Sequence, residues 1–215
     1  MNSAVDFIRD ISVWAVPTVF AIIAHEVMHG VVARWLGDDT AARAGRLTLN
    51  PISHVDLFGT ILMPAVLLFL HLPVFGYAKP VPVNFSRLRN GRTGMMEVAV
   101  AGPVTNFILA IVSAIALRLL MPMLAGPGDH PIALPLAYMM HASVIINVVL
   151  AVFNLFPLLP LDGGRVLAGL LPLRAARAFA RLEPYGFLIL LLLLYTNSID
   201  VVINPVINAI ARVLL

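Results

Sequence analysis

The sequence predicts an all-α polytopic membrane protein, a single domain over residues 1–215. We expect a bundle of about five to six membrane helices with a re-entrant extended or β segment near the functional site. Of the 215 residues, 60% are hydrophobic and only 12% are charged, which excludes an ordinary soluble globule. Several apolar stretches are long enough to cross a hydrocarbon core of about 30 Å. The arginines fall between these stretches and not on one basic face, which indicates a lipid bilayer and not a nucleic acid as partner.

The predicted helices follow apolar runs that end at charged or turn-forming residues. They cover about residues 11–36, 57–70, 94–122, 132–156, 184–197 and 200–215. Basic residues gather after the first helix, before the third and after the fourth, whereas the loop at 124–131 contains no Lys or Arg. Since basic loops face the cytoplasm, the first and fourth helices should run inward through the cell membrane and the third outward. Residues 163–182 alternate Arg with apolar residues, which predicts one interfacial amphipathic helix.

The second apolar run departs from this scheme because both of its flanks are basic. It is short, contains Pro64, and is followed by a stretch in which Pro80 and Pro82 favour extended backbone. We therefore expect residues of about 73–84 to enter from the cytoplasmic side and return, partly as a hairpin or strand. Such a strand could pair with an unwound peptide by strand addition. The alternative is an ordinary crossing that violates the charge rule.

The motif that carries chemistry is His25-Glu26-Val27-Met28-His29 in the first apolar helix. Two imidazoles four residues apart share one side of a helix, and a glutamate next to them can act as a general base, which is the spacing of a zinc hydrolase site. Glu26 is the only formally charged residue between Ile11 and Arg34, and an unpaired carboxylate in hydrocarbon is costly. The alternative is a helix whose two histidines are buried for packing reasons.

Zinc requires a third protein ligand. The sequence contains no cysteine, and we consider three acidic residues as candidates. Glu183 follows a basic stretch and is expected to pair with Arg. Glu97 opens a helix near Arg92, where it can interact with the helix dipole. Asp162 is favoured because it ends an apolar run rich in proline and precedes two glycines that allow a tight turn into the protein. The alternative for Asp162 is a helix cap at the membrane surface.

Taken together, several motifs resemble those of the site-2 protease family of intramembrane zinc metalloproteases. The motifs are His25-Glu26-x-x-His29, Gly102-Pro103-x-x-Asn106 and Asn154-x-x-Pro157-x-x-Pro160-Leu161-Asp162-Gly163. The segments Asn50-Pro51-Ile52-Ser53-His54 and Gly76-Tyr77-Ala78-Lys79-Pro80-Val81-Pro82 are similar to its compact prokaryotic subgroup, which lacks PDZ and CBS modules. The resemblance covers roughly residues 15–170.

This resemblance implies a complete catalytic site. It implies that His25, His29 and Asp162 bind one Zn²⁺ per chain and that Glu26 is the catalytic base. It also implies a membrane-embedded strand region before the third core helix, which agrees with the expectation for residues 73–84. Asn154 is similar to an asparagine that the family has near its site, so we expect it to donate to the oxyanion or to clamp the substrate. An interhelical hydrogen bond is the alternative for Asn154.

Two further polar residues of these motifs have less specific expectations. His54 could be a hydrogen-bond partner near the metal, a substrate contact or a simple interface histidine. Asn106 is expected to help pack its helix beside Gly102 and not to take part in catalysis. We assign no role to the other histidines, which lack metal-like spacing.

The function that this sequence predicts is zinc-dependent intramembrane endopeptidase activity on transmembrane segments of other membrane proteins. His25 lies about nine residues, or roughly 14 Å, from the charged end of its helix, which places the site below the surface and nearer the cytosol. The alternatives are a catalytically silent relative that binds membrane helices, and a zinc hydrolase of small amphiphilic substrates. Metal transport is disfavoured because the ionisable residues cluster at one depth.

Overall fold

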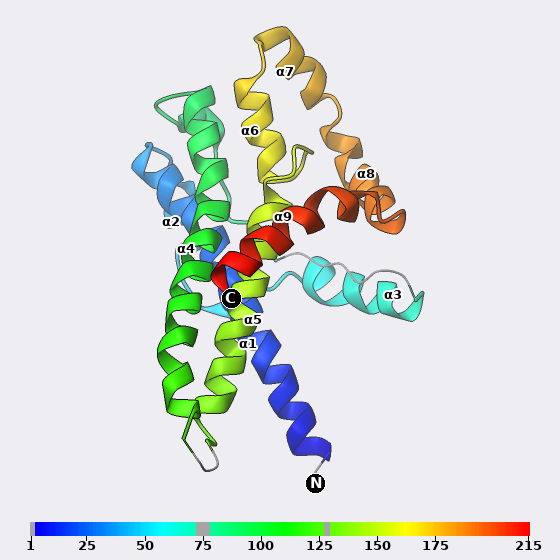
Figure 1. Cartoon of the computed structure of the whole chain (residues 1–215). Helices are drawn as coiled ribbons and strands as arrows, with labels where there is room; N and C mark the ends of the chain where they lie inside the picture. The colour runs from blue at the N-terminus through cyan, green and yellow to red at the C-terminus, as the bar shows by residue number, and fades with distance from the viewer. Residues whose placement is uncertain (1–2, 72–77, 127–129) are drawn as a thin grey trace.

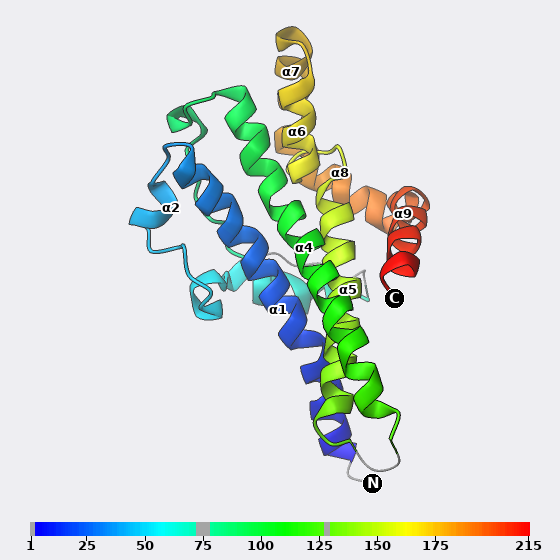
Figure 2. The same ribbon diagram turned by 60° about the vertical axis from the view of Figure 1, so that its left-hand side comes forward.

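Three long helices form the centre of the molecule. The structure is a computed structural model that describes residues 3–71, 78–126 and 130–215, and all regular secondary structure in these ranges is helical. Helices α1 (Ser3–Trp35), α4 (Arg92–Leu124) and α5 (Ala133–Asn154) pack against one another in all three pairs. Figures 1 and 2 show the N-terminal end of α1 at the same end of the bundle as the α4–α5 connection. The all-helical fold class is thus confirmed.

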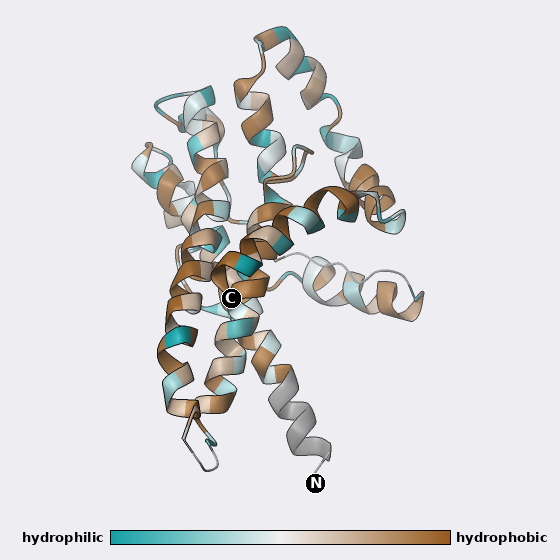
Figure 3. Cartoon of the chain, viewed as in Figure 1, coloured by the Kyte–Doolittle hydropathy of each residue, from teal (hydrophilic) through white to brown (hydrophobic). Residues whose placement is uncertain are grey.

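The three long helices approach closely because the residues between them are small. The buried residues of this kind include Ala21 and Ala33 of α1, Ala99, Gly102 and Ala110 of α4, and Ala142 and Ala151 of α5. Small residues let helix backbones come together where no hydrophobic effect drives association, as inside a bilayer. Large apolar side chains instead point outward, and Figure 3 shows brown, hydrophobic ribbon along most of α4 and α5.

Three of the described helices are long and apolar enough to cross a membrane, namely Ile11–Trp35, Arg92–Leu124 and Ala133–Asn154. A fourth span is formed if α7 (Leu173–Ala180) and α8 (Glu183–Tyr195), which meet at an angle of 66°, count as one broken helix. The expected helix at 57–70 is a π-helix, Leu57–Leu62, continued by α3 (Met63–Phe69), and with 13 residues it is too short to span. The helix at 200–215, α9 (Ser198–Leu214), has 17 residues. The predicted number of five to six membrane helices is therefore not confirmed.

The single interfacial helix expected over 163–182 is wrong, because the chain forms two helices there. Helix α6 (Asp162–Leu170) ends before Pro172, and α7 begins after it. Proline lacks an N–H and keeps the preceding residue extended, and Leu171 accordingly has ψ of 148°. The guanidinium of Arg92 donates hydrogen bonds to the carbonyls of Ala168, Gly169 and Leu171 and so closes the C-terminal end of α6.

The segment expected to be re-entrant is described only from residue 78, since residues 73–77 of that prediction lie outside the described residues. Residues 78–84 have neither helical nor strand structure, and hydrogen bonds join them to Glu26 of α1 and to Asp38 just after that helix. Short helices flank this extended segment: α2 (Thr40–Arg43), η1 (Pro51–His54) and η3 (Phe85–Arg87). The predicted β structure is not confirmed among these residues.

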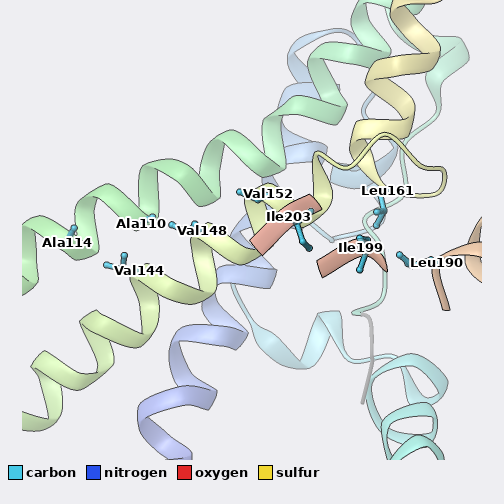
Figure 4. Packing of buried hydrophobic residues seen from close by; sticks show 9 residues of the cluster. All are labelled: Ala110, Ala114, Val144, Val148, Val152, Leu161, Leu190, Ile199 and Ile203. Carbon is cyan, nitrogen blue, oxygen red and sulfur yellow. The ribbon is translucent and has the colours of Figure 1, made fainter. Parts of the chain in front are cut away.

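A buried apolar cluster joins the C-terminal helices to the long ones. Figure 4 shows its nine residues, which are Ala110 and Ala114 of α4, Val144, Val148 and Val152 of α5, Leu161, Leu190 of α8, and Ile199 and Ile203 of α9. Burial of such side chains contributes about 25 cal/mol per Å² of apolar area. Because Leu161 is part of this cluster, its packing with α8 and α9 also fixes the start of α6, where Asp162 lies.

Candidate metal centre

Two histidines of α1 face helix α4 in the interior of the molecule. His25 and His29 are one helical turn apart, and their Nε2 atoms lie 3.1 Å from each other. The rings meet edge to face at an interplanar angle of 87°. This arrangement follows from the local sequence, because residues i and i+4 of any α-helix lie on one face.

Asp162, the first residue of α6, completes the group. Its Oδ2 lies 3.1 Å from Nε2 of His25 and 3.3 Å from Nε2 of His29. Within the described residues this is the group of His and acidic side chains that could hold a metal ion, with its ligand atoms all within 4.8 Å of one another. Glu97, by contrast, is exposed on α4, and Glu183 lies 3.6 Å from Arg165 in a partly exposed ion pair.

The loop before Asp162 can bring the carboxylate to the histidines because two glycines follow it. A Cβ atom on Gly163 would collide with the backbone carbonyl of Leu155, and one on Gly164 with the backbone nitrogen of Leu159. Both glycines are buried. The backbone of α6 therefore packs directly on the loop of residues 155–159, which turns the chain tightly enough to direct Asp162 inward.

The hydrogen bonds of the two imidazoles show that this site suits a cation. Nδ1 of His29 donates to the carbonyl of Val98 (2.7 Å), and Nδ1 of His25 donates to Oδ1 of Asn106 (2.6 Å). In a neutral imidazole the other nitrogen then carries a lone pair. Two Nε2 lone pairs and a carboxylate oxygen of Asp162 that has no hydrogen-bond partner thus converge without a donor between them. A divalent cation satisfies all three atoms, and nitrogen and carboxylate ligands match zinc.

Gly102 is the reason that α4 can approach the two histidines. A Cβ atom at this position would lie 2.5 Å from Cε1 of His25 and 2.6 Å from Nε2 of both His25 and His29. Any side chain here would occupy the space of the ligands. Gly102 is part of a motif found in the sequence, but the contact of Gly102 with the two imidazole rings depends on how α1 and α4 pack.

Asn106 has a different place from the one expected. It is fully buried and accepts the hydrogen bond of His25, and its amide group donates to Asn147 Oδ1 (2.8 Å) and to the carbonyl of Ala21 (3.2 Å). Asn147 in turn donates to the backbone and side chain of Ser143. The expectation of a packing role alone is therefore incomplete, because Asn106 also orients His25. Asn147 received no prediction, although a buried Asn in an apolar helix, two turns before Asn154, could have indicated it.

Glu26 accepts a hydrogen bond from the backbone N–H of Val81 at its Oε2 (2.9 Å). The extended segment that carries Val81 is fixed on both sides, since Lys79 N–H donates to His54 O and Asn84 N–H donates to Asp38 Oδ2. Burial alone would raise the pKa of the Asp38 carboxyl, but hydrogen bonds from Thr40 and from Asn84 hold that pKa below its usual value. Asp38 is therefore ionised at neutral pH and keeps the extended segment next to Glu26.

Similar proteins were found by two kinds of comparison. The profile of "Peptidase family M50" matches residues 122–196, which include Asp162. "Putative zinc metalloprotease YwhC" of Bacillus subtilis is 38% identical over 195 residues, which cover 89% of this chain and 84% of that protein. The chain belongs to peptidase family M50. This family of zinc metalloproteases is the site-2 protease family that the motifs resemble.

A second M50-like relative is more distant. "Putative zinc metalloprotease Rip2" of Mycolicibacterium smegmatis is 27% identical over 195 residues, or 90% of this chain and 69% of that protein. No solved structure matches the chain. The cofactor of this M50 metalloprotease is Zn²⁺, and the convergent atoms of His25, His29 and Asp162 form a site that fits it.

Two cavities of the M50 metalloprotease meet at the site. One, of about 550 Å³, is lined mainly by apolar side chains from α1, the π-helix, α5 and α8. The other, of about 230 Å³, contains His29 and Asp162 together with the extended segment and Arg165. His25, Glu26 and Asn154 line both cavities.

The structure places the remaining predicted residues as follows. Asn154 ends α5 beside the cavities, and its amide nitrogen donates to the carbonyl of Leu150 in its own helix (2.9 Å). His54 is buried away from the ligand atoms, with its Nε2 bonded to Thr48 O (2.8 Å) and its carbonyl bonded to Lys79 N–H. His54 thus supports the extended segment through its backbone.

Proposed function

We propose that this zinc metalloprotease is an intramembrane endopeptidase that hydrolyses peptide bonds in or near transmembrane segments of other membrane proteins. The observation that carries the proposal is the position of the site. His25, Glu26 and His29 lie within Ile11–Trp35, a helix of membrane-spanning length, and His25 and Glu26 border a large apolar cavity. A catalytic site inside such a helix suits a substrate that reaches it from the bilayer.

Each residue of the site has a proposed role. His25, His29 and Asp162 hold one Zn²⁺ per chain. Zinc, when bound there, polarises the scissile carbonyl and lowers the pKa of a water. Glu26 accepts the proton of that water and returns it to the leaving amine, while the Val81 N–H fixes the orientation of its carboxylate. Asn154 lines both cavities and is placed to donate to the oxyanion or to the substrate backbone.

The proposed orientation puts the active site nearer the cytoplasmic side of the cell membrane. The arginine-rich segments after α1, before α4 and after α5 lie at the end of the bundle opposite the α4–α5 connection, as Figure 1 shows. Basic residues favour the cytoplasm, which supports this orientation. The short helix pair Leu57–Phe69 then enters the membrane from the cytoplasmic side without crossing it, and α9 completes the bundle of five to six membrane helices.

The proposal is tested with purified protein and a detergent-solubilised single-span substrate. Glu26→Gln keeps an acceptor for the Val81 N–H but removes the base, so cleavage should fall by about 10²–10⁴-fold while the zinc content stays unchanged. Glu97→Gln, which makes the same change at an exposed position of α4, is the matched control and should cleave normally.

The outcomes separate the proposal from its alternatives. If Glu26→Gln cleaves as well as the wild type, Glu26 is not the base. If the wild type binds the span but never cuts it, the protein is a silent helix-binding relative. If it hydrolyses only small amphiphilic esters or amides, it is a hydrolase of another substrate class.

A further inference from the structure

We infer that the substrate of this site is bipartite: an apolar segment on one side of the scissile bond, and an acidic residue on the other side that pairs with Arg165. This inference rests on the proposed function and adds a substrate class to it. The observation behind it is the different character of the two cavities that share His25, Glu26 and Asn154. A peptide that passes the catalytic residues must lie in both.

The larger cavity selects for apolar residues. Its lining includes Phe58 and Met63 from the π-helix and α3, Phe153 from α5, and Phe187 and Leu190 from α8. Glu26 and His25 are the only ionisable groups among its lining residues, and they are the proposed base and a proposed zinc ligand. A charged substrate residue here would lose its hydration without a partner, which is costly.

The smaller cavity has the opposite character because Arg165 lines it. Among its described lining residues Arg165 is the only Lys or Arg, and the others include both Glu26 and Asp162. Arg165 lies three residues after Asp162 in α6, one helical turn away and on the same side. A substrate carboxylate in this cavity would be repelled by Glu26, so its favourable position is beside the guanidinium of Arg165.

The guanidinium of Arg165 is positioned but not tightly paired. It lies over the ring of Phe85, 5.0 Å from the centroid, which holds the side chain at the cavity. Its ion pair with Glu183 is long at 3.6 Å, and the Glu183 side chain is 48% exposed. Exposed pairs of this kind are weak, so a substrate carboxylate can replace Glu183. An arginine fork binds a carboxylate with two parallel hydrogen bonds.

The test uses a family of single-span substrates in which one position on the polar side of the span carries Glu, Gln or Lys. The position is moved residue by residue through the region of cleavage. At its best position, we expect the wild type to cleave the Glu substrate roughly tenfold faster in kcat/KM than the Lys substrate. Arg165→Glu should invert this preference, and Glu183→Gln should increase it by removing the competing carboxylate.

Arg174→Glu is the matched control, because Arg174 is exposed on α7 and the substitution changes the net charge by the same amount. It should keep the wild-type preference. Binding is measured separately with the Glu26→Gln protein and a fluorescent Glu-bearing substrate, whose anisotropy change should be lost in the Glu26→Gln/Arg165→Glu double variant.

Two results overturn the inference. One is equal cleavage of the Glu, Gln and Lys substrates at every position by the wild type. The other is an Arg165→Glu protein that loses activity on all substrates in the same proportion, as a role in folding or in lipid-headgroup contact would produce. If the wild type cleaves none of the substrates, the proposed function fails. The anisotropy measurement then tests the inference by itself, because a preference for binding the Glu substrate supports the role of Arg165 even without cleavage.

Discussion

Asn106 and Gly102 determine the geometry of the proposed ligands His25 and His29, although neither belongs to the ligand set. Asn106 fixes the proton of His25 on Nδ1, so that Nε2 is available as a ligand. Gly102 leaves room for both rings against α4. One hydrogen bond and one missing Cβ atom therefore decide whether the two histidines of α1 form a metal site.

Gly102→Ala should abolish zinc binding. Its Cβ would come within 2.5 Å of the His25 ring and 2.6 Å of His29 Nε2, and the packed helix backbones leave little room to adjust. Metal analysis of the purified protein should show loss of nearly all bound zinc. Gly126→Ala is the control because no atom lies within 4 Å of the added Cβ. A stoichiometric zinc content in Gly102→Ala would contradict the predicted contact.

Asn106→Leu should weaken zinc binding by about 10–100-fold, because His25 loses the acceptor that orients it. Asn147→Leu removes only the next link of the network and should have a smaller effect. Zinc affinity is measured by competition with a chromophoric chelator. Ser113→Ala, at the far end of the same buried network, should leave affinity unchanged. Equal affinities in all four proteins would show that the network serves only helix packing.

The extended segment of residues 78–84 acts as one wall of the site. Its N–H groups are directed to fixed partners, His54 O at Lys79, Glu26 at Val81 and Asp38 at Asn84. Pro80 and Pro82 have no N–H to offer on the alternate positions. The segment therefore orients the carboxylate of Glu26 and presents only carbonyl acceptors from its two prolines.

Val81→Pro should lower kcat by roughly ten- to a hundredfold, since it removes a hydrogen bond to a charged group. Zinc content should not change, because Val81 is not one of the three proposed ligands. Val81→Ala is the control, because it changes the side chain but keeps the N–H. A kcat for Val81→Pro equal to that of Val81→Ala would show that the backbone donor does not orient Glu26.

At the scale of the molecule, the proposed metal site connects parts of the chain that are distant in sequence. His25 and His29 belong to α1, and Asp162 starts α6 after a loop that the apolar cluster with α8 and α9 holds in place. A bound ion thus crosslinks the first helix to the C-terminal half. Any ligand that binds only the folded state adds to its stability.

Removal of zinc should accordingly lower the melting temperature. A ligand present at 100 times its Kd stabilises the folded state by about 2.7 kcal/mol. We expect chelation to cause a drop of several degrees in thermal unfolding in detergent, and added zinc to reverse it. Asp162→Ala should melt at the lower temperature with or without the chelator. A zinc-independent melting temperature in the wild type would mean that the three residues do not hold the ion.

The sequence by itself determined the features that depend on local spacing and on composition. His25 and His29 share a helix face because they are four residues apart, and long apolar runs at 11–36, 94–122 and 132–156 form helices because the backbone must satisfy its own hydrogen bonds in lipid. Asp162 was favoured by the proline-rich run before it and the two glycines after it, and the family resemblance implied the same ligand through its motif.

Only the tertiary structure decided the contacts between distant residues. The bond from Asn106 to His25 joins positions 81 residues apart, and that from Val81 to Glu26 joins positions 55 residues apart. Such pairings depend on the angle and depth at which helices and loops pack, which side-chain periodicity does not encode. For the same reason the number of membrane helices predicted from the sequence is not confirmed, and Arg165 was not predicted as the cation beside the site. The helix motif places His25 and His29 on one face, and the packing of the other helices and loops brings Asp162 and the hydrogen-bond partners to them.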